Sequence, residues 1–142
     1  MKGFDISNSK LKGLTPLDLY KNRDINAFRA GGTLTEVLIP MYKDLLCLAL
    51  GNDVDKTFYD KVLSKQQTEQ IQTIFEEQID LHIPKMETKL PYDNFIEWKG
   101  KKYEMNLRLH SPINRRIMDF YKIISICKEC LAENKPMYLS IV

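Results

Sequence analysis

The chain has 142 residues, of which 44% are hydrophobic and 28% are charged. These values suit a single globular domain over residues 1–142 and exclude a disordered chain. A domain of this size can bury enough apolar surface to fold without disulfides or a metal. The formal net charge of +2 is too small to draw the whole molecule to nucleic acid or to an acidic membrane.

The chain has three cysteines. An odd number predicts reduced thiols and a cytoplasmic protein. The most apolar segment, residues 37–50, contains a proline and charged side chains and is too short to span a bilayer, so we expect no membrane partner. Lysine outnumbers arginine 16 to 5, a composition typical of low-GC bacteria and their phages. A phage-encoded protein would be located in the virion.

Residues 1–32 show no sustained period of 3.6 or 2 and are predicted to form an irregular arm. One short helix is expected after Thr15, which can cap it, with Pro16 at the first helical position. An arm of this length either packs on its own domain or docks on a partner, and the sequence leaves both alternatives open.

A helix is expected from the capping box Thr33–Glu36 to about Leu50, with Gly51 as its stop. Residues 45–50 are apolar on every side of a helix, so we interpret this helix as the central one. A short helix that carries Phe58, Tyr59, Val62 and Leu63 should follow residues 53–55.

A second capping box, Ser64–Gln67, predicts a helix with an apolar stripe of Ile71, Ile74, Phe75 and Ile79. The opposite face of this helix carries four acidic side chains: Glu69, Glu76, Glu77 and Asp80.

The second half predicts an irregular stretch over 81–94, a hairpin that turns at Lys99-Gly100, a long helix from Ser111-Pro112 to about Asn134, and a buried strand over 137–142. The hairpin strands are expected around 96–98 and 103–109. The predicted fold class is therefore α+β, with a helical N-terminal half packed on a small, mainly antiparallel sheet. The last strand is expected to return to that sheet, beside the hairpin.

No residue pattern indicates a catalytic or metal site, and no cofactor is predicted. Cys127 and Cys130 form a C-x-x-C near the C-terminal end of the long helix, where the dipole does not stabilise a thiolate, so we interpret both as core residues. His82 in the irregular stretch and His110 at a strand end have no adjacent nucleophile, and we expect structural or solvated histidines. The chain is therefore predicted not to be an enzyme.

Two segments are candidates for binding. The arm places apolar side chains at irregular spacing, as in segments that order on a partner; its candidates are Phe4, Ile6, Leu11, Leu14 and Leu17. The hairpin tip and the first turn of the next helix are basic; the candidates there are Lys99, Lys101, Lys102, Arg108, Arg115, Arg116 and Trp98. These charges could contact phosphates, or simply discourage strand aggregation.

The function that this pattern favours is a non-enzymatic protein–protein interaction or assembly protein, such as a phage-type structural or assembly component. Its partners would be other protein subunits, copies of itself among them. The alternative is a small nucleic-acid-binding or regulatory or inhibitor protein that uses the basic hairpin tip.

Overall fold

The structure, a computed structural model, describes residues 3–30, 39–51, 56–108 and 111–141. These residues form an α+β fold. Its elements are β1 (Phe4–Ser7), α1 (Pro16–Lys21), β2 (Ala27–Ala30), α2 (Ile39–Leu50), β3 (Phe58–Leu63), α3 (Lys65–His82), the 3-10 turn η2 (Ile83–Lys85), β4 (Asn94–Trp98), β5 (Lys101–Met105), α4 (Pro112–Ala132) and β6 (Met137–Ile141). Among the described residues, no helix has a stretch both long and apolar enough to cross a membrane.

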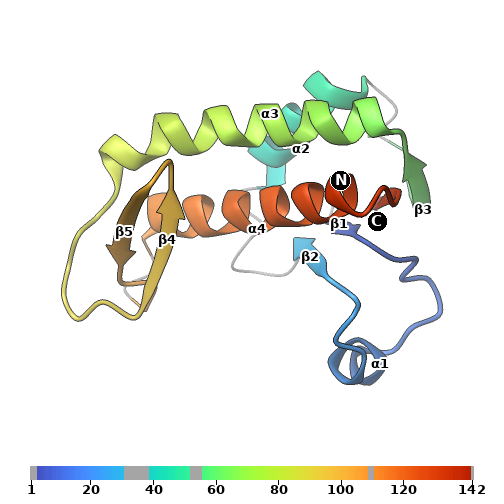
Figure 1. Cartoon of the computed structure of the whole chain (residues 1–142), viewed down its shortest axis with the longest axis horizontal. Helices are drawn as coiled ribbons and strands as arrows, with labels where there is room; N and C mark the ends of the chain where they lie inside the picture. Colours follow the sequence, from blue (N-terminus) through green and yellow to red (C-terminus); the bar gives the residue numbers. More distant parts are fainter. Residues whose placement is uncertain (1–2, 31–38, 52–55, 109–110, 142) are drawn as a thin grey trace.

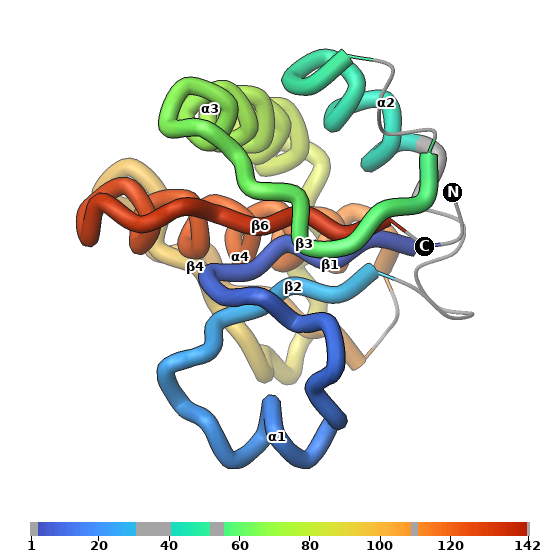
Figure 2. Tube along the Cα trace, turned by 90° about the vertical axis from the view of Figure 1, so that its right-hand side faces the viewer, coloured from blue at the N-terminus to red at the C-terminus, as the bar shows by residue number. Residues whose placement is uncertain are grey.

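The main sheet has the strand order β2-β1-β6-β3, and every neighbouring pair is antiparallel. Phe4 lies opposite Ala30 on one side and Ile141 on the other, so these side chains share one face of the sheet. That face is buried against α4, and the strands lie in front of this helix in Figure 2. Figure 1 shows α3 lying along α4, and β4 and β5 form a separate hairpin at one end of the helix pair.

An aromatic cluster joins the helices to the sheet. The ring of Phe120 in α4 lies 5.6 Å from Tyr42 of α2, 5.4 Å from Phe75 of α3 and 5.2 Å from His82. Tyr42 in turn contacts Phe4 of β1 with ring centres 5.9 Å apart. All five side chains are buried, so α4 forms the centre of the core.

The prediction that the N-terminal half is helical is wrong. Three strands of the main sheet, β1, β2 and β3, come from that half, and the helices are spread through the chain. The described part of the predicted arm, residues 3–30, contributes two of these strands. The last strand, β6, lies between β1 and β3 rather than beside the hairpin.

The predicted short helix with Phe58 and Val62 is also wrong, because these residues form the edge strand β3. The pairing of β3 with β6 shifts between Phe58 and Lys61, and Asp60 has a φ of +51°. This irregularity inserts one extra residue into the strand and disrupts the two-residue alternation by which a strand is recognised.

Helix α2 ends at Gly51 as predicted, where a φ of +80° favours glycine. The predicted capping box Thr33–Glu36 lies outside the described residues. The helix is not the central one, since Leu48 on it is 76% exposed. The expected features of α1, α3, α4 and the hairpin turn are confirmed, although β5 ends at Met105 rather than near 109.

A buried polar pair connects α2 to α4. The Tyr42 hydroxyl donates to Asp119 Oδ2 at 2.8 Å, and Arg115 Nε lies 3.4 Å from the other carboxylate oxygen. Burial raises the pKa of Asp119, while the hydrogen bond from Tyr42 opposes that rise. The hydroxyl therefore stabilises an ionised carboxylate that would otherwise be poorly solvated.

Substitution Tyr42→Phe should lower the free energy of unfolding by about 1–3 kcal/mol, because it leaves a buried carboxylate without its donor. The pKa of Asp119 is raised in the folded state, so burying the ionised carboxylate costs folding free energy. This cost disappears as the pH falls through the folded-state pKa and the carboxylate becomes protonated. Tyr42→Phe should therefore lower the free energy of unfolding more at neutral pH than at acidic pH. Urea unfolding of both proteins at the two pH values measures this difference. Tyr121→Phe, at a half-buried ring on α4, is the control, and an equal loss of stability in both variants would contradict the prediction.

Candidate interaction surface

The connection between β1 and β2 is far longer than these strands require. Adjacent antiparallel strands can be joined by a two-residue turn. Here the connection runs from residue 8 to residue 26, leaves the sheet, forms α1 and returns. We call residues 8–26 the α1 lobe. Figures 1 and 2 show it projecting from the body of the molecule on the side away from α2 and α3.

The two ends of the α1 lobe are held together and fixed to α4. Asn8 N–H donates to the Asn26 carbonyl at 3.0 Å, and Asn26 N–H donates to Asn8 Oδ1 at 2.8 Å. Both side-chain amides donate to Glu129 Oε2 in α4, at 3.3 and 3.2 Å. The base of the lobe is therefore fixed to the central helix.

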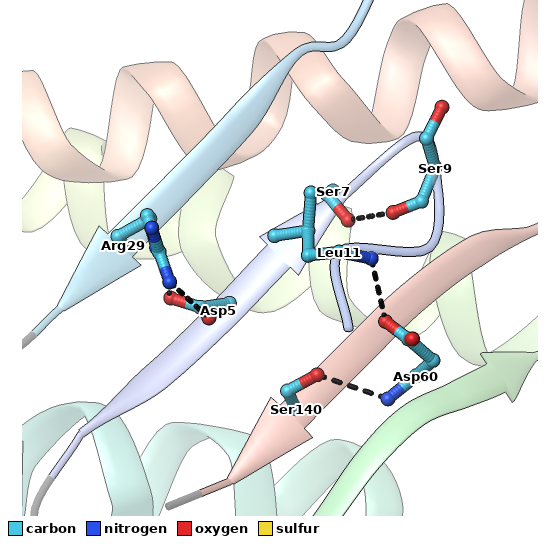
Figure 3. Close-up of polar contacts among 7 residues, drawn as sticks. All are labelled: Asp5, Ser7, Ser9, Leu11, Arg29, Asp60 and Ser140. Atoms are coloured by element: carbon cyan, nitrogen blue, oxygen red, sulfur yellow. Dashed lines mark hydrogen bonds and ion pairs between the residues drawn. The ribbon is translucent and has the colours of Figure 1, made fainter. Parts of the chain in front are cut away.

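A second anchor comes from β3 (Figure 3). The Asp60 carboxylate accepts a hydrogen bond from the backbone N–H of Leu11 at 2.9 Å. Its other oxygen accepts from the backbone N–H of Lys12 at 3.1 Å. Asp60 N–H itself donates to Ser140 Oγ of β6 at 2.9 Å. The irregular β3 strand thus directs a carboxylate toward the lobe, and charge-assisted hydrogen bonds of this kind are stronger than neutral ones.

Local sequence orders the rest of the α1 lobe. Leu14 N–H donates to the Leu11 carbonyl at 3.0 Å, and Gly13 has a φ of +86°, which suits the third position of a type II turn. Thr15 and Asp18 then form the capping box that begins α1. Hydrogen bonds from the backbone and side chain of Thr15 hold the pKa of Asp18 below its usual value.

Helix α1 buries none of its own residues. Leu14, Leu17 and Tyr20 are exposed to 38%, 57% and 85%. Leu17 and Tyr20 lie on this helix, and Leu14 lies just before its N-cap Thr15. A capped, anchored segment that adds little to the core thus exposes three apolar side chains close together in sequence, and clustered exposed apolar groups mark interaction sites.

The five predicted arm residues divide into two groups. Phe4, Ile6 and Leu11 are buried within the domain, so they are not available to a partner in this fold. Leu14 and Leu17 are exposed on the α1 lobe. Sequence reasoning missed Tyr20 as a binding residue, although its position three residues after Leu17 places both on adjacent turns of a helix.

The cations of the α1 lobe are not paired with any carboxylate of the described part of the chain. Among the described residues, Lys10, Lys21 and Arg23 form no ion pair and are exposed. Lys12 Nζ lies 5.6 Å from the centre of the Tyr59 ring in β3. The lobe therefore combines exposed apolar groups with uncompensated positive charge.

Most cations of the hairpin tip, by contrast, are paired with acids. Lys99 lies 2.8 Å from Asp80, Lys102 lies 3.5 Å from Glu104, and Arg108 lies 3.5 Å from Asp93. Arg115 pairs with Asp119, as described above. These ion pairs lower the positive potential that a phosphate would experience.

The other predicted tip residues are covered or isolated from one another. Trp98 is only 6% exposed, and its indole N–H donates to Asp80 Oδ1 at 2.9 Å, so its ring is not free to stack on a base. Lys101 lies over the Tyr103 ring at 5.3 Å. Arg116 is half-buried on α4, and its Nε finds no hydrogen-bond acceptor among the described residues.

The cysteines and histidines do not converge. Cys127 is buried with its Sγ 3.7 Å from Met137 Sδ, and burial raises the pKa of Cys127 to about 12 and that of Cys130 to about 11. His82 ends α3 rather than lying in an irregular stretch; it is buried, and its Nδ1 lies 2.7 Å from the Gln78 carbonyl oxygen. His110 lies outside the described residues. Within the described ranges, no three acidic, histidine or cysteine side chains are grouped as a metal site.

The sequence matches no protein-family model, and neither a curated protein nor a solved structure gives a significant match.

Substitution Asp60→Gly should loosen the α1 lobe, because glycine keeps the positive φ while removing the acceptor of two backbone N–H groups. Amide hydrogen exchange at Leu11 and Lys12 should accelerate, while amides in α3 keep their protection. Asp60→Asn, which retains one oxygen, should show a smaller effect. Unchanged exchange at Leu11 and Lys12 in the glycine variant would contradict this anchor.

Alkylation at neutral pH should modify Cys47, which is half-buried, before Cys127 and Cys130. Burial keeps the latter two protonated, and the thiol form does not react. Peptide mass mapping after timed iodoacetamide treatment, with and without denaturant, measures the order. Modification of Cys127 as fast as that of Cys47 in the folded protein would contradict it.

Proposed function

We propose that the protein is a non-enzymatic protein–protein interaction or assembly module that binds another protein subunit through the α1 lobe. The observation that carries this proposal is the exposure of Leu17 and Tyr20 on a helix that buries no residue of its own, with Leu14 exposed just before that helix begins. A phage-type assembly component, as the sequence suggests, would be one protein of this kind.

The energetics of the lobe support a binding role. Fixing each residue of the backbone costs about 1–2 kcal/mol in conformational entropy. Most side chains of the lobe are exposed, so their burial offsets little of this cost. Polar anchors to Asp60 and Glu129 nevertheless hold it in one place. A preorganised helix loses less entropy on binding, and burying a leucine side chain at an interface contributes about 1.5–3 kcal/mol.

The nucleic-acid alternative receives less support. Its predicted contacts at the hairpin tip are largely paired with Asp80, Asp93 and Glu104. The outward residues of the hairpin also alternate in charge, since Glu97 lies opposite Lys102. A nucleic-acid surface requires uncompensated cations along the path of the phosphates.

Point variants test the proposal better than truncation. Removing the N-terminal segment would delete β1 and β2 from the sheet and so destroy the fold with the surface.

Substitution Leu17→Asp should abolish association with the partner while leaving the unfolding midpoint nearly unchanged, because the side chain is 57% exposed. The affinity should fall by at least about tenfold, as for a central interface residue. Association is measured by the mass of the purified protein in solution and by capture from an extract of the cells that produce it.

Leu90→Asp is the matched control, since Leu90 is 74% exposed and lies outside the α1 lobe. It should associate as the unmodified protein does. Retention of every association by the Leu17→Asp variant would refute a binding role for the lobe.

A further inference from the structure

We propose that the partner of the α1 lobe is a second copy of this chain, and that the lobe of one copy docks on a hollow between α2 and α3 of the next. This inference rests on the proposed function and identifies its partner. It follows from a surface feature, a charge pattern and a spatial arrangement.

The surface feature is an open hollow of 290 Å³ between α2 and α3. Its lining combines apolar and polar side chains: Leu48, Gln66, Glu69, Gln70, Thr73 and Ile74. Leu48 is 76% exposed, whereas Ile74 is half-buried and packs against the core. The hollow therefore offers two apolar side chains, Leu48 and Ile74, as contacts for the leucines of the lobe.

The charge pattern of the two surfaces is complementary. Lobe residues 10–24 carry four cations and two carboxylates, for a net charge of +2, while α3 residues 65–80 carry one cation and four carboxylates, for −3. Within the described residues, Glu69, Glu76 and Glu77 of α3 form no ion pair, as Lys21 and Arg23 of the lobe form none. Docking would bring these uncompensated charges together, which favours association and fixes its orientation.

The spatial arrangement prevents the lobe from reaching the hollow of its own chain. Both views place α1 at one end of the molecule and the α2–α3 pair at the other (Figures 1 and 2). Contact between two different surfaces is heterologous, so a bound pair still has one free lobe and one free hollow. Further copies can add until a ring closes, or a filament grows, which is the behaviour of an assembly component.

A complementation experiment tests this arrangement. Sedimentation velocity of the full chain should show a mass that rises above 16.6 kDa with loading concentration. The lobe variant Leu17→Asp and the hollow variant Leu48→Lys should each weaken self-association at least about tenfold, which is the loss expected at a central contact. An equimolar mixture of the two variants should form a dimer of twice the chain mass and nothing larger, because only one intact lobe and one intact hollow remain per pair.

Charge reversal gives an independent readout. Arg23→Glu alone should weaken self-association, and adding Glu69→Lys in the same chain should restore part of it. Leu90→Asp and Leu90→Lys, at a side chain exposed to a similar extent as Leu48, should behave as the unmodified chain.

A chain that stays monomeric at every concentration, or a Leu48→Lys variant that still assembles normally, would overturn the inference. The proposed function would survive that result if Leu17→Asp still prevented capture of a different protein. If Leu17→Asp altered no association of any kind, the proposed function itself would fail.

Discussion

The pairing of β1 with β6 is the constraint on which the rest of the structure depends. Strand β1 has four residues and is stable only because it is hydrogen-bonded on both sides, to β2 and to β6. The register that sets Phe4 opposite Ile141 and Ile6 opposite Leu139 directs all four side chains toward the core. A slip of β1 by one residue would replace Phe4 and Ile6 with Asp5 and Ser7 on the core face, so burial fixes the register strongly. The same pairing determines where the α1 lobe leaves the sheet, and it places Ser140 where it can hold Asp60.

Elements with strong local signals were predictable from the sequence. Helices α3 and α4 have caps and apolar stripes long enough to be recognised alone, and the Lys99-Gly100 turn identifies the hairpin. The strands β1 and β2 were not predictable, because four residues are too few to establish alternation and their stability comes from distant partners. The sequence of β3 favours a helix because Phe58 and Val62 are four residues apart, a spacing that suits one face of a helix as well as one face of a strand. The irregularity between Phe58 and Lys61 removes the strict alternation that would distinguish the two.

The candidate site was predictable only in part. Its location near the N-terminus followed from apolar residues without a period, but leucines that are buried and leucines that are exposed look alike in such a segment. Leu11 and Leu14 differ because Asp60, far away in sequence, holds the backbone at Leu11 against the sheet. The basic tip was over-interpreted for the same reason. Its cations are visible in the sequence, whereas the carboxylate of Asp80 that pairs with Lys99 comes from α3, outside the hairpin.

The placement of the α1 lobe as an insertion within a hairpin has an evolutionary consequence. The strands on either side, β1 and β2, are held by their own register, and residues 10–24 lie mostly on the outside of the fold. Mutations in this stretch should therefore change the surface of the lobe with little effect on the packing around Phe120. If the lobe binds a partner as proposed, binding specificity and fold can diverge at separate rates, and relatives of this chain would retain the same sheet and helices while binding different partners.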